Sequence, residues 1–204
     1  MFKRSIVVLG AAAVLSAFAS PAKAATVIDF GTGLAGTGGV YTLLAGGNAS
    51  GSNIPIGVVN IANAPINNGV FVVTSGALNF NTVSNTITLS GAVTGLGINS
   101  AITLFSGSFL SFVASAQGLT NAVGPDTPAP ALLTALGLPA NTPFVLFGFS
   151  LSTNNSAVVG GATDSVISTD IRNTSVPEPG SMLLLGSGLL GMATVVRRRS
   201  MKKV

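Results

Sequence analysis

The stretch from residue 70 to residue 95, VFVVTSGALNFNTVSNTITLSGAVTG, decides the fold class. It contains three short runs of apolar residues and threonine, with Ser-Gly and Ser-Asn between them: Val70–Thr74, Ala77–Thr82 and Thr86–Ser90. Residues of this kind are enriched in strands, and the two dipeptides at this spacing are typical of hairpin turns. In the third run, threonine and serine alternate with Ile87 and Leu89, so one face is expected to be buried and the other solvated. The stretch therefore predicts antiparallel β structure.

Further strands are predicted on both sides of this stretch. An Asn-Gly pair at residue 68 provides a turn before the first run. Three later segments have the same strand character: Gly107–Ser115, Phe144–Ser152 and Asp164–Arg172. Several short strands at even spacing are typical of two packed sheets. We therefore expect an all-β, antiparallel two-sheet sandwich or jelly-roll-like domain.

Two segments depart from the strand pattern. Residues 131–136 follow a proline-rich loop and precede Gly137 and Pro139, which predicts one short helix. Its leucines are expected to plug one end of the sandwich. The glycine-rich stretch Phe30–Asn53 lacks the following helix and the acidic residue of a dinucleotide-binding loop, so a flexible loop is expected there.

Charged side chains are rare and unevenly placed. They make up 7% of the 204 residues. Between Ala25 and Val176, four aspartates and one arginine give a net charge of −3, whereas eight basic residues and Glu178 give the two ends +7. A basic stripe that could neutralise phosphates is absent from the sequence, so nucleic acid is not expected as a partner.

The residue types needed for most catalytic and metal sites are missing. The sequence has no histidine and no cysteine, which excludes Ser-His-Asp and Cys-His nucleophiles, disulfides and thiolate metal sites. Asp164 and Asp170 would lie about 20 Å apart on one extended strand. Asp29 and Asp126 are remote from them in sequence, so each aspartate is expected in a turn or in solvent, and a shared Ca²⁺ site stays open. We expect no enzyme activity and no cofactor.

Aromatic residues do not indicate a sugar-binding platform. Sugar rings are usually held on the flat faces of Tyr and Trp. Tyr41 is the one tyrosine, tryptophan is absent, and the phenylalanines lie inside apolar runs where core packing explains them. A hydrogen-bonding surface of asparagine and threonine stays open as an alternative.

Residues 1–24 have the features of a signal peptide. Two basic residues precede an apolar run of fourteen residues, Ile6–Ala19. As a helix this run spans about 21 Å, too short for a hydrocarbon core about 30 Å thick. Ala22 and Ala24 provide small side chains at positions −3 and −1 for cleavage before Ala25. We expect export through the Sec machinery and removal of this segment by signal peptidase, with an uncleaved anchor helix as the alternative.

The C-terminal segment has three parts in a fixed order. Val176, Pro177, Glu178 and Pro179 are expected to be extended and accessible, because proline fixes φ and lacks an N–H group. Sixteen uncharged residues, 181–196, then predict a short transmembrane helix of about 24 Å. The basic tail, 197–203, begins with Arg197, Arg198 and Arg199, and the positive-inside rule keeps it in the cytoplasm.

These three parts resemble the sorting signal of PEP-CTERM proteins, and the resemblance covers residues 176 to about 199. It implies recognition and processing by an exosortase, an integral-membrane cysteine peptidase-transpeptidase, at the inner membrane of a Gram-negative bacterium. The protein would be anchored in the membrane transiently and then reach the cell surface or the extracellular space. Such proteins share the signal and differ in their domains, so the resemblance implies a route and not an activity. In the family this route is associated with exopolysaccharide production and with extracellular matrix or floc material.

The predicted organisation has three parts: a signal peptide at 1–24, a β-rich extracellular domain at 25–175, and a PEP-CTERM-like sorting signal at 176–200 with its motif at 176–180. The leading hypothesis is an exported, non-enzymatic protein with a structural or adhesive role in an exopolysaccharide-associated matrix. One alternative is a surface-displayed module that binds polysaccharide or Ca²⁺. Another is a single-pass protein that stays anchored in the membrane.

Overall fold

The computed structural model describes residues 25–154, 164–175 and 188. Residues Ala25–Val176 form one compact unit, and its described part is called the β domain below. The predicted signal helix at 1–24 lies outside the described residues, and so does the predicted transmembrane helix at 181–196 apart from Gly188. In the part of the chain that the structure describes, no helix has the length and apolarity needed to cross a membrane.

The β domain consists of strands joined by short connections. Its strands are β1 Val27–Gly31, β2 Gly38–Leu44, β3 Asn48–Ala62, β4 Gly69–Asn81, β5 Thr86–Val93, β6 Ile98–Gly107, β7 Ser111–Ser115, β8 Gly118–Gly124, β9 Asp126–Pro128, β10 Phe144–Thr153 and β11 Asp164–Ser175. Its helical turns are η1 Gly33–Ala35, η2 Ala45–Gly47, η3 Thr94–Leu96 and α2 Pro130–Ala135.

All eleven described strands belong to one sheet. Its order is β7-β8-β10-β11-β1-β3-β4-β5-β6-β9, and β2 pairs with both β11 and β3. Every pairing is antiparallel. The short strands β1 and β2 follow one another between the same two neighbours, β3 and β11. Neighbouring positions in the sheet therefore run in opposite directions, and β1 and β2 together occupy one position.

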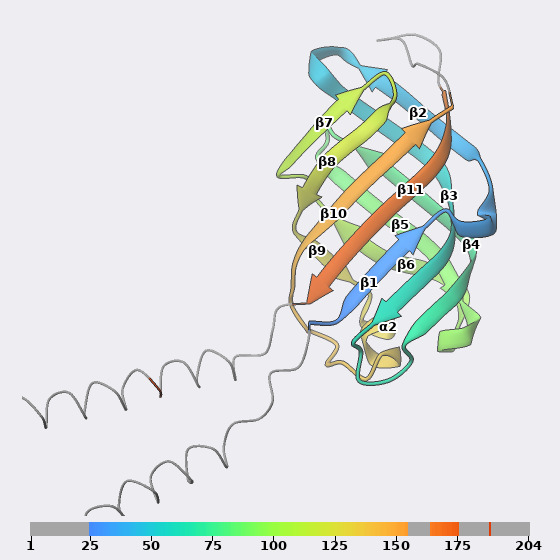
Figure 1. Cartoon of the computed structure of the whole chain (residues 1–204), viewed down its shortest axis with the longest axis vertical. Coiled ribbons are helices and arrows are strands. Elements are labelled where there is room, and N and C mark those ends of the chain that lie inside the picture. Colours follow the sequence, from blue (N-terminus) through green and yellow to red (C-terminus); the bar gives the residue numbers. More distant parts are fainter. Residues whose placement is uncertain (1–24, 155–163, 176–187, 189–204) are drawn as a thin grey trace, which may run out of the picture. The chain divides into compact units, whose positions relative to one another are not determined.

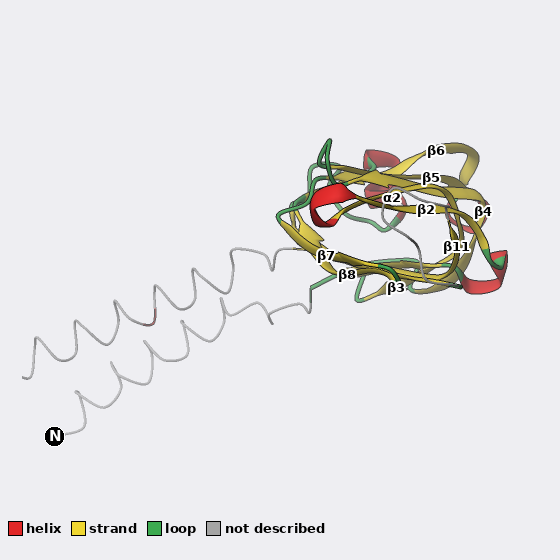
Figure 2. Cartoon of the chain, turned by 90° about the horizontal axis from the view of Figure 1, so that it is seen from above, coloured by secondary structure: helices red, strands yellow, loops and turns green. Residues whose placement is uncertain are grey.

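Two bends close this sheet on itself. Residues 108–110 carry β6 into β7, and Pro125 carries β8 into β9. The ladder continues across the bends, because the Ser108 amide donates to the Pro125 carbonyl (3.1 Å) and the Leu110 amide donates to the Val123 carbonyl (2.8 Å). The two ends of the strand order are thereby joined, and β11 lies beside β1 at the front of the domain (Figure 1). Seen from above, the strands surround the interior (Figure 2).

The predicted all-β antiparallel class is confirmed, but the two separate sheets of the predicted sandwich are wrong. Each strand pairs with a strand close to it in the chain, and the first strand pairs with the last. The bends at 108–110 and Pro125 carry strands from one wall to the other without breaking the ladder. Alternation of buried and exposed residues is the same for a packed pair of sheets and for one closed sheet, so periodicity cannot distinguish them.

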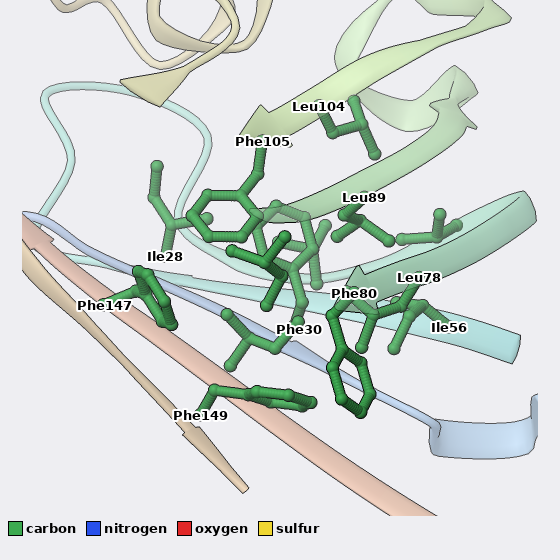
Figure 3. Close-up of a cluster of buried hydrophobic side chains, with 14 of the residues drawn as sticks. Ile28, Phe30, Ile56, Leu78, Phe80, Leu89, Leu104, Phe105, Phe147 and Phe149 are labelled. Atoms are coloured by element: carbon green, nitrogen blue, oxygen red, sulfur yellow. The ribbon is translucent and has the colours of Figure 1, made fainter. Parts of the chain in front are cut away.

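Phenylalanine rings and branched aliphatic side chains fill the interior. Phe80 of β4 meets Phe149 of β10 edge to face with ring centroids 5.4 Å apart, and Phe105 of β6 meets Phe147 of β10 in the same way at 5.4 Å. Figure 3 shows these rings converging from different strands with Phe30 beside them. Such pairs add to the stabilisation from buried area. Most phenylalanines of the described residues are therefore core residues, and Phe71 and Phe112 are partly buried against the core.

The predicted short helix and its role as a plug are confirmed. Helix α2 begins at Pro130, and its side chains Leu132 and Leu133 are buried, as is Leu136, which follows the helix. The β3–β4 loop packs against it, since the Asn67 side-chain amide donates to the Ala135 carbonyl at 2.8 Å.

The predicted flexible loop at Phe30–Asn53 is wrong. This stretch contains β2 and the first residues of β3, which pair with each other from Val40–Ser52 to Leu44–Asn48. Tyr41 and Leu43 alternate with outward residues and are buried. The Tyr41 hydroxyl donates to the Ser115 and Gly118 carbonyls at 2.8 and 3.0 Å. Strand β2 is hard to recognise in the sequence, because glycines surround it and only a few residues supply its inward side chains.

The hairpin turn predicted at Ser75-Gly76 is also wrong. The Ser-Asn turn lies where it was expected, between β4 and β5, but β4 runs without interruption through Ser75 and Gly76. The β4–β5 register shifts between Thr74 and Ala77, and Ser75 has a φ of 52°, so this point is a β-bulge. A Cβ added at Gly76 would lie 2.0 Å from the Ile56 carbonyl oxygen.

We expect Gly76→Ala to destabilise the domain by about 1–3 kcal/mol, because the backbone of β3 leaves no room for a methyl group. Gly148→Ala on β10 is the matched control, since a Cβ there meets nothing within 4 Å. Chemical denaturation of both variants measures the difference. Equal stabilities of the two variants would contradict the close approach at Gly76.

Candidate functional site

The residues predicted to direct processing lie outside the described part of the chain. These residues are Ala22, Ala24, Val176, Pro177, Glu178, Pro179, Arg197, Arg198 and Arg199. Their roles stay predictions. The structure describes the chain immediately inside both predicted boundaries, from Ala25 and up to Ser175.

These two boundaries of the β domain lie side by side. The Thr26 amide donates to the Ser175 hydroxyl, and the Ser175 amide donates to the Thr26 carbonyl, both at 2.9 Å. Asn63 donates its side-chain amide to the Ala25 carbonyl at 3.3 Å and accepts from the Thr26 hydroxyl at 3.1 Å through its own carbonyl. The last residue before the predicted motif is therefore part of the folded domain and is tied to its first strand.

A shallow hollow of about 330 Å³ lies on the outer face of the sheet. Four strands contribute polar side chains in one cross-strand row: Thr42 of β2, Ser50 of β3, Asn81 of β4 and Thr86 of β5. A second pair, Asn79 and Thr88, lines the same hollow. The β3–β4 register shifts between Gly51 and Ile54, and a bulge of this kind bends a strand.

The hollow is uncharged and its asparagines are held in place. The Asn79 Oδ1 atom accepts from the Asn53 amide at 3.0 Å. The Asn81 Oδ1 atom accepts from the Val83 and Ser84 amides at 2.8 and 3.2 Å. With these oxygen atoms occupied, the Nδ2 groups are the atoms that can donate to a ligand, beside hydroxyls that donate or accept. This arrangement suits a neutral, polyhydroxylated ligand.

Two aspartates that are far apart in the sequence meet on the outer face. Asp29 of β1 lies opposite Arg172 of β11, and Asp170 lies two residues from Arg172 on the same strand. Burial, together with the hydrogen bond and the negative charge of Asp170, raises the pKa of Asp29 from 3.8 to about 6, although Arg172 acts in the opposite direction. The expectation that Asp29 lies in a turn or in solvent is wrong, because it is a half-buried residue of β1, and antiparallel pairing of the first and last strands brings it to Asp170.

Asp126 differs from Asp29 and Asp170 because it faces the interior. Its Oδ2 atom accepts a hydrogen bond from the side-chain amide of Asn173, which is buried on β11. Burial raises the pKa of Asp126 to about 6, although the Asn173 hydrogen bond and a hydrogen bond from the backbone of Asp126 itself act in the opposite direction. The expectation of a turn or solvent position is wrong for Asp126. Among the described residues, no group of three or more His, Cys, Asp or Glu side chains is placed to hold a metal ion.

Sequence reasoning missed the hollow and the Asp126–Asn173 pair because both join residues from distant strands. The signal for the hollow is the alternation of polar residues in Asn79–Asn81 and Thr86–Thr88. This alternation predicts a solvated face but does not show that the face is hollowed. Tyr41 is buried with no exposed surface, so it cannot serve as a sugar platform.

We expect Asp170→Asn to lower the pKa of Asp29 from about 6 toward 3.8, because the substitution removes the negative charge beside it. Since the folded state raises this pKa, protonation of Asp29 stabilises the wild-type domain as the pH falls from about 6 to about 4. Carboxyl ¹³C NMR titration measures the midpoint directly. An unchanged midpoint in the variant would contradict the interaction.

Comparison with known proteins identifies one feature. The family description "PEP-CTERM protein-sorting motif" matches residues 175–199. Neither the curated proteins nor the solved structures include a significant match. The match begins at Ser175, the last residue of β11. The chain therefore carries a PEP-CTERM protein-sorting motif, which begins at the last residue of the β domain.

Proposed function

We propose that this protein is exported, sorted through its C-terminal motif, and used as a structural or adhesive component of an exopolysaccharide-associated matrix. The observation that carries the proposal is the sorting motif at residues 175–199, which implies processing by exosortase-type machinery and export across the inner membrane to the cell surface. A predicted signal peptide at the other end of the chain agrees with this route. The final protein would consist of the β domain with both end segments removed.

A non-enzymatic role is part of this proposal. The complete sequence lacks histidine and cysteine, the side chains that most often act as base and nucleophile. Of the four aspartates, Asp126 is held inside the domain by Asn173, and Asp29 lies beside Asp170 and Arg172 on the convex outer face. The hollow on β2–β5 contains none of the four.

The closed sheet determines how such a protein could cohere with its surroundings. In the described residues the strand order returns on itself, so the backbone hydrogen-bonding groups of the wall are used within the domain except in the interval between β9 and the start of β10. Strand addition at an open edge, a common cause of aggregation, is therefore disfavoured. Cohesion would instead use side chains of the outer face, where Ser, Thr and Asn predominate along β5 and the second half of β4, from Thr74 to Asn81.

The sorting step is tested by Pro177→Ala with Glu178→Ala. We expect the double variant to accumulate in the membrane fraction at a larger mass than the wild type, because the altered segment is no longer recognised. Pro139→Ala, an exposed proline of the loop after α2, is the control and should leave mass and location unchanged. If the double variant has the mass and location of the wild-type protein, the processing proposal fails.

The hollow favours a second candidate function, a module that binds a neutral polysaccharide. Its seven polar side chains are uncharged and include both donors and acceptors, and its volume of about 330 Å³ is at the lower end for small-ligand sites. An aromatic platform is absent from it, since the phenylalanine that borders it, Phe80, is buried in the core. Binding would therefore be weak for each domain and would gain strength from many copies.

We expect Thr88→Arg, which fills the hollow, to abolish co-sedimentation with the polysaccharide purified from the matrix of the producing organism. Thr120→Arg adds the same charge on an exposed position of β8 and should leave co-sedimentation unchanged. Equal loss in both variants would indicate a charge effect, and no loss in either would exclude the hollow. Wild-type protein that does not co-sediment would leave the structural role as the only candidate.

A further inference from the structure

The buried pair of Asp126 and Asn173 lies where the wall of the sheet is weakest. Strand β8 pairs with β10 as far as Gly124 and Phe147, but β9, which follows, pairs with β6. Between β9 and the start of β10 no backbone pairing is found among the described strands. The hydrogen bond from Asn173 to Asp126 crosses this interval and joins β9 to β11.

Two oxygen atoms of the pair are buried without a partner. The Oδ1 atoms of Asp126 and Asn173 both lack a hydrogen bond, although Asn173 has no exposed surface. Leaving a buried polar atom unpaired is costly. Both atoms are acceptors when Asp126 is ionised, so they cannot satisfy each other. One proton on Asp126 Oδ1 turns it into a donor, and a carboxyl group and a carboxamide can then form two parallel hydrogen bonds.

The surroundings offer no charge that would compensate an ionised Asp126. Its cross-strand partner on β6 is Gly107, and Asn173 lies between Ile28 of β1 and Phe147 of β10. Among the residues of β1 and β11 whose side chains the structure describes, the charged ones are Asp29, Asp170 and Arg172, and alternation places them on the outer face. Tyr41 donates its hydroxyl to the β7–β8 turn. A proton is thus the simplest species that satisfies both oxygen atoms.

We propose that Asp126 and Asn173 form a proton-operated latch, in which protonated Asp126 makes two hydrogen bonds to Asn173 and fastens the end of β11, and ionised Asp126 releases one of them. Asn173 is two residues before Ser175, where the sorting motif begins. The latch therefore controls how firmly the last strand is held beside the segment that is processed. It is independent of the matrix role.

The direction of the pH effect follows from burial. The folded domain raises the pKa of Asp126 above the unfolded value, to about 6, so the folded state binds an extra proton between about pH 4 and pH 6. The latch is closed at the acid end of this window and loosens as the pH rises through it. A second bond that requires the proton would move the upper limit of the window higher.

The test uses the full-length chain in detergent micelles, with ¹³C-labelled aspartate and amide hydrogen exchange. We expect the Asp126 carboxyl to titrate near pH 6 or above, and the protection of the Ser175 amide to fall about tenfold as the pH passes that midpoint, after correction for intrinsic exchange. Asp126→Asn keeps two possible hydrogen bonds to Asn173 without a titrating group, so the pH dependence should disappear. Asp170→Asn, a substitution on the outer face of β11, should retain the pH dependence.

Several results would overturn the latch. Titration of Asp126 near 3.8, or protection of Ser175 that is independent of the midpoint, would show that the pair does not bind the proton. If Asp126→Asn fails to fold, the titration of Asp126 and the hydrogen exchange of the Ser175 amide in the wild type still test the latch. A rise in melting temperature on adding Ca²⁺ to the wild type, absent in Asp126→Asn, would mean that the two oxygen atoms hold a cation instead.

Discussion

The pairing of the first strand with the last is the constraint on which the rest of the β domain depends. Strand β1 pairs with β11 from Val27–Thr174 to Gly31–Asp170. Buried side chains fasten both ends of this ladder. Thr26 and Ser175 exchange hydrogen bonds at one end, across a separation of 149 residues in the chain, and the Thr32 and Thr169 hydroxyls lie 2.9 Å apart at the other. Without this ladder the sheet would have two open edges and an exposed core.

The closure has a consequence for folding. Contacts between residues this distant in sequence require a large loop to close, which slows folding. The ladder cannot form until β11 is available, and β11 ends where the sorting motif begins. In the exported precursor, completion of the fold and presentation of the motif therefore involve adjacent residues. The same closure leaves the outer side chains as the surface for contact with other molecules.

Features that depend on neighbouring residues could be predicted from the sequence, whereas the pairing of distant strands could not. The alternation around Ile87 and Leu89, the hairpin at Ser84-Asn85 and the proline at the start of α2 act over a few residues, so they could be recognised in one sequence. Strand β2 was missed because glycines dilute its pattern. The closure was missed because burial alternates in the same way in one closed sheet and in two packed sheets.

The candidate sites show the same difference between continuous segments and combinations of distant strands. The sorting motif is a continuous segment, so its residue order was sufficient to predict it, and the family comparison matches residues 175–199. The hollow, the Asp29–Asp170 contact and the Asp126–Asn173 latch each combine residues from strands far apart in the chain. Their positions depend on register, which shifts at several bulges and cannot be inferred from spacing.

The most direct test of the central claim is the intact mass and the terminal peptides of the protein recovered from its native host, with surface and membrane fractions measured separately. The account predicts a surface form that starts at Ala25 and ends between Pro177 and Gly180, so that the β domain is complete and both end segments are gone. A chain that still ends at Val204 and is found only in the membrane would contradict it.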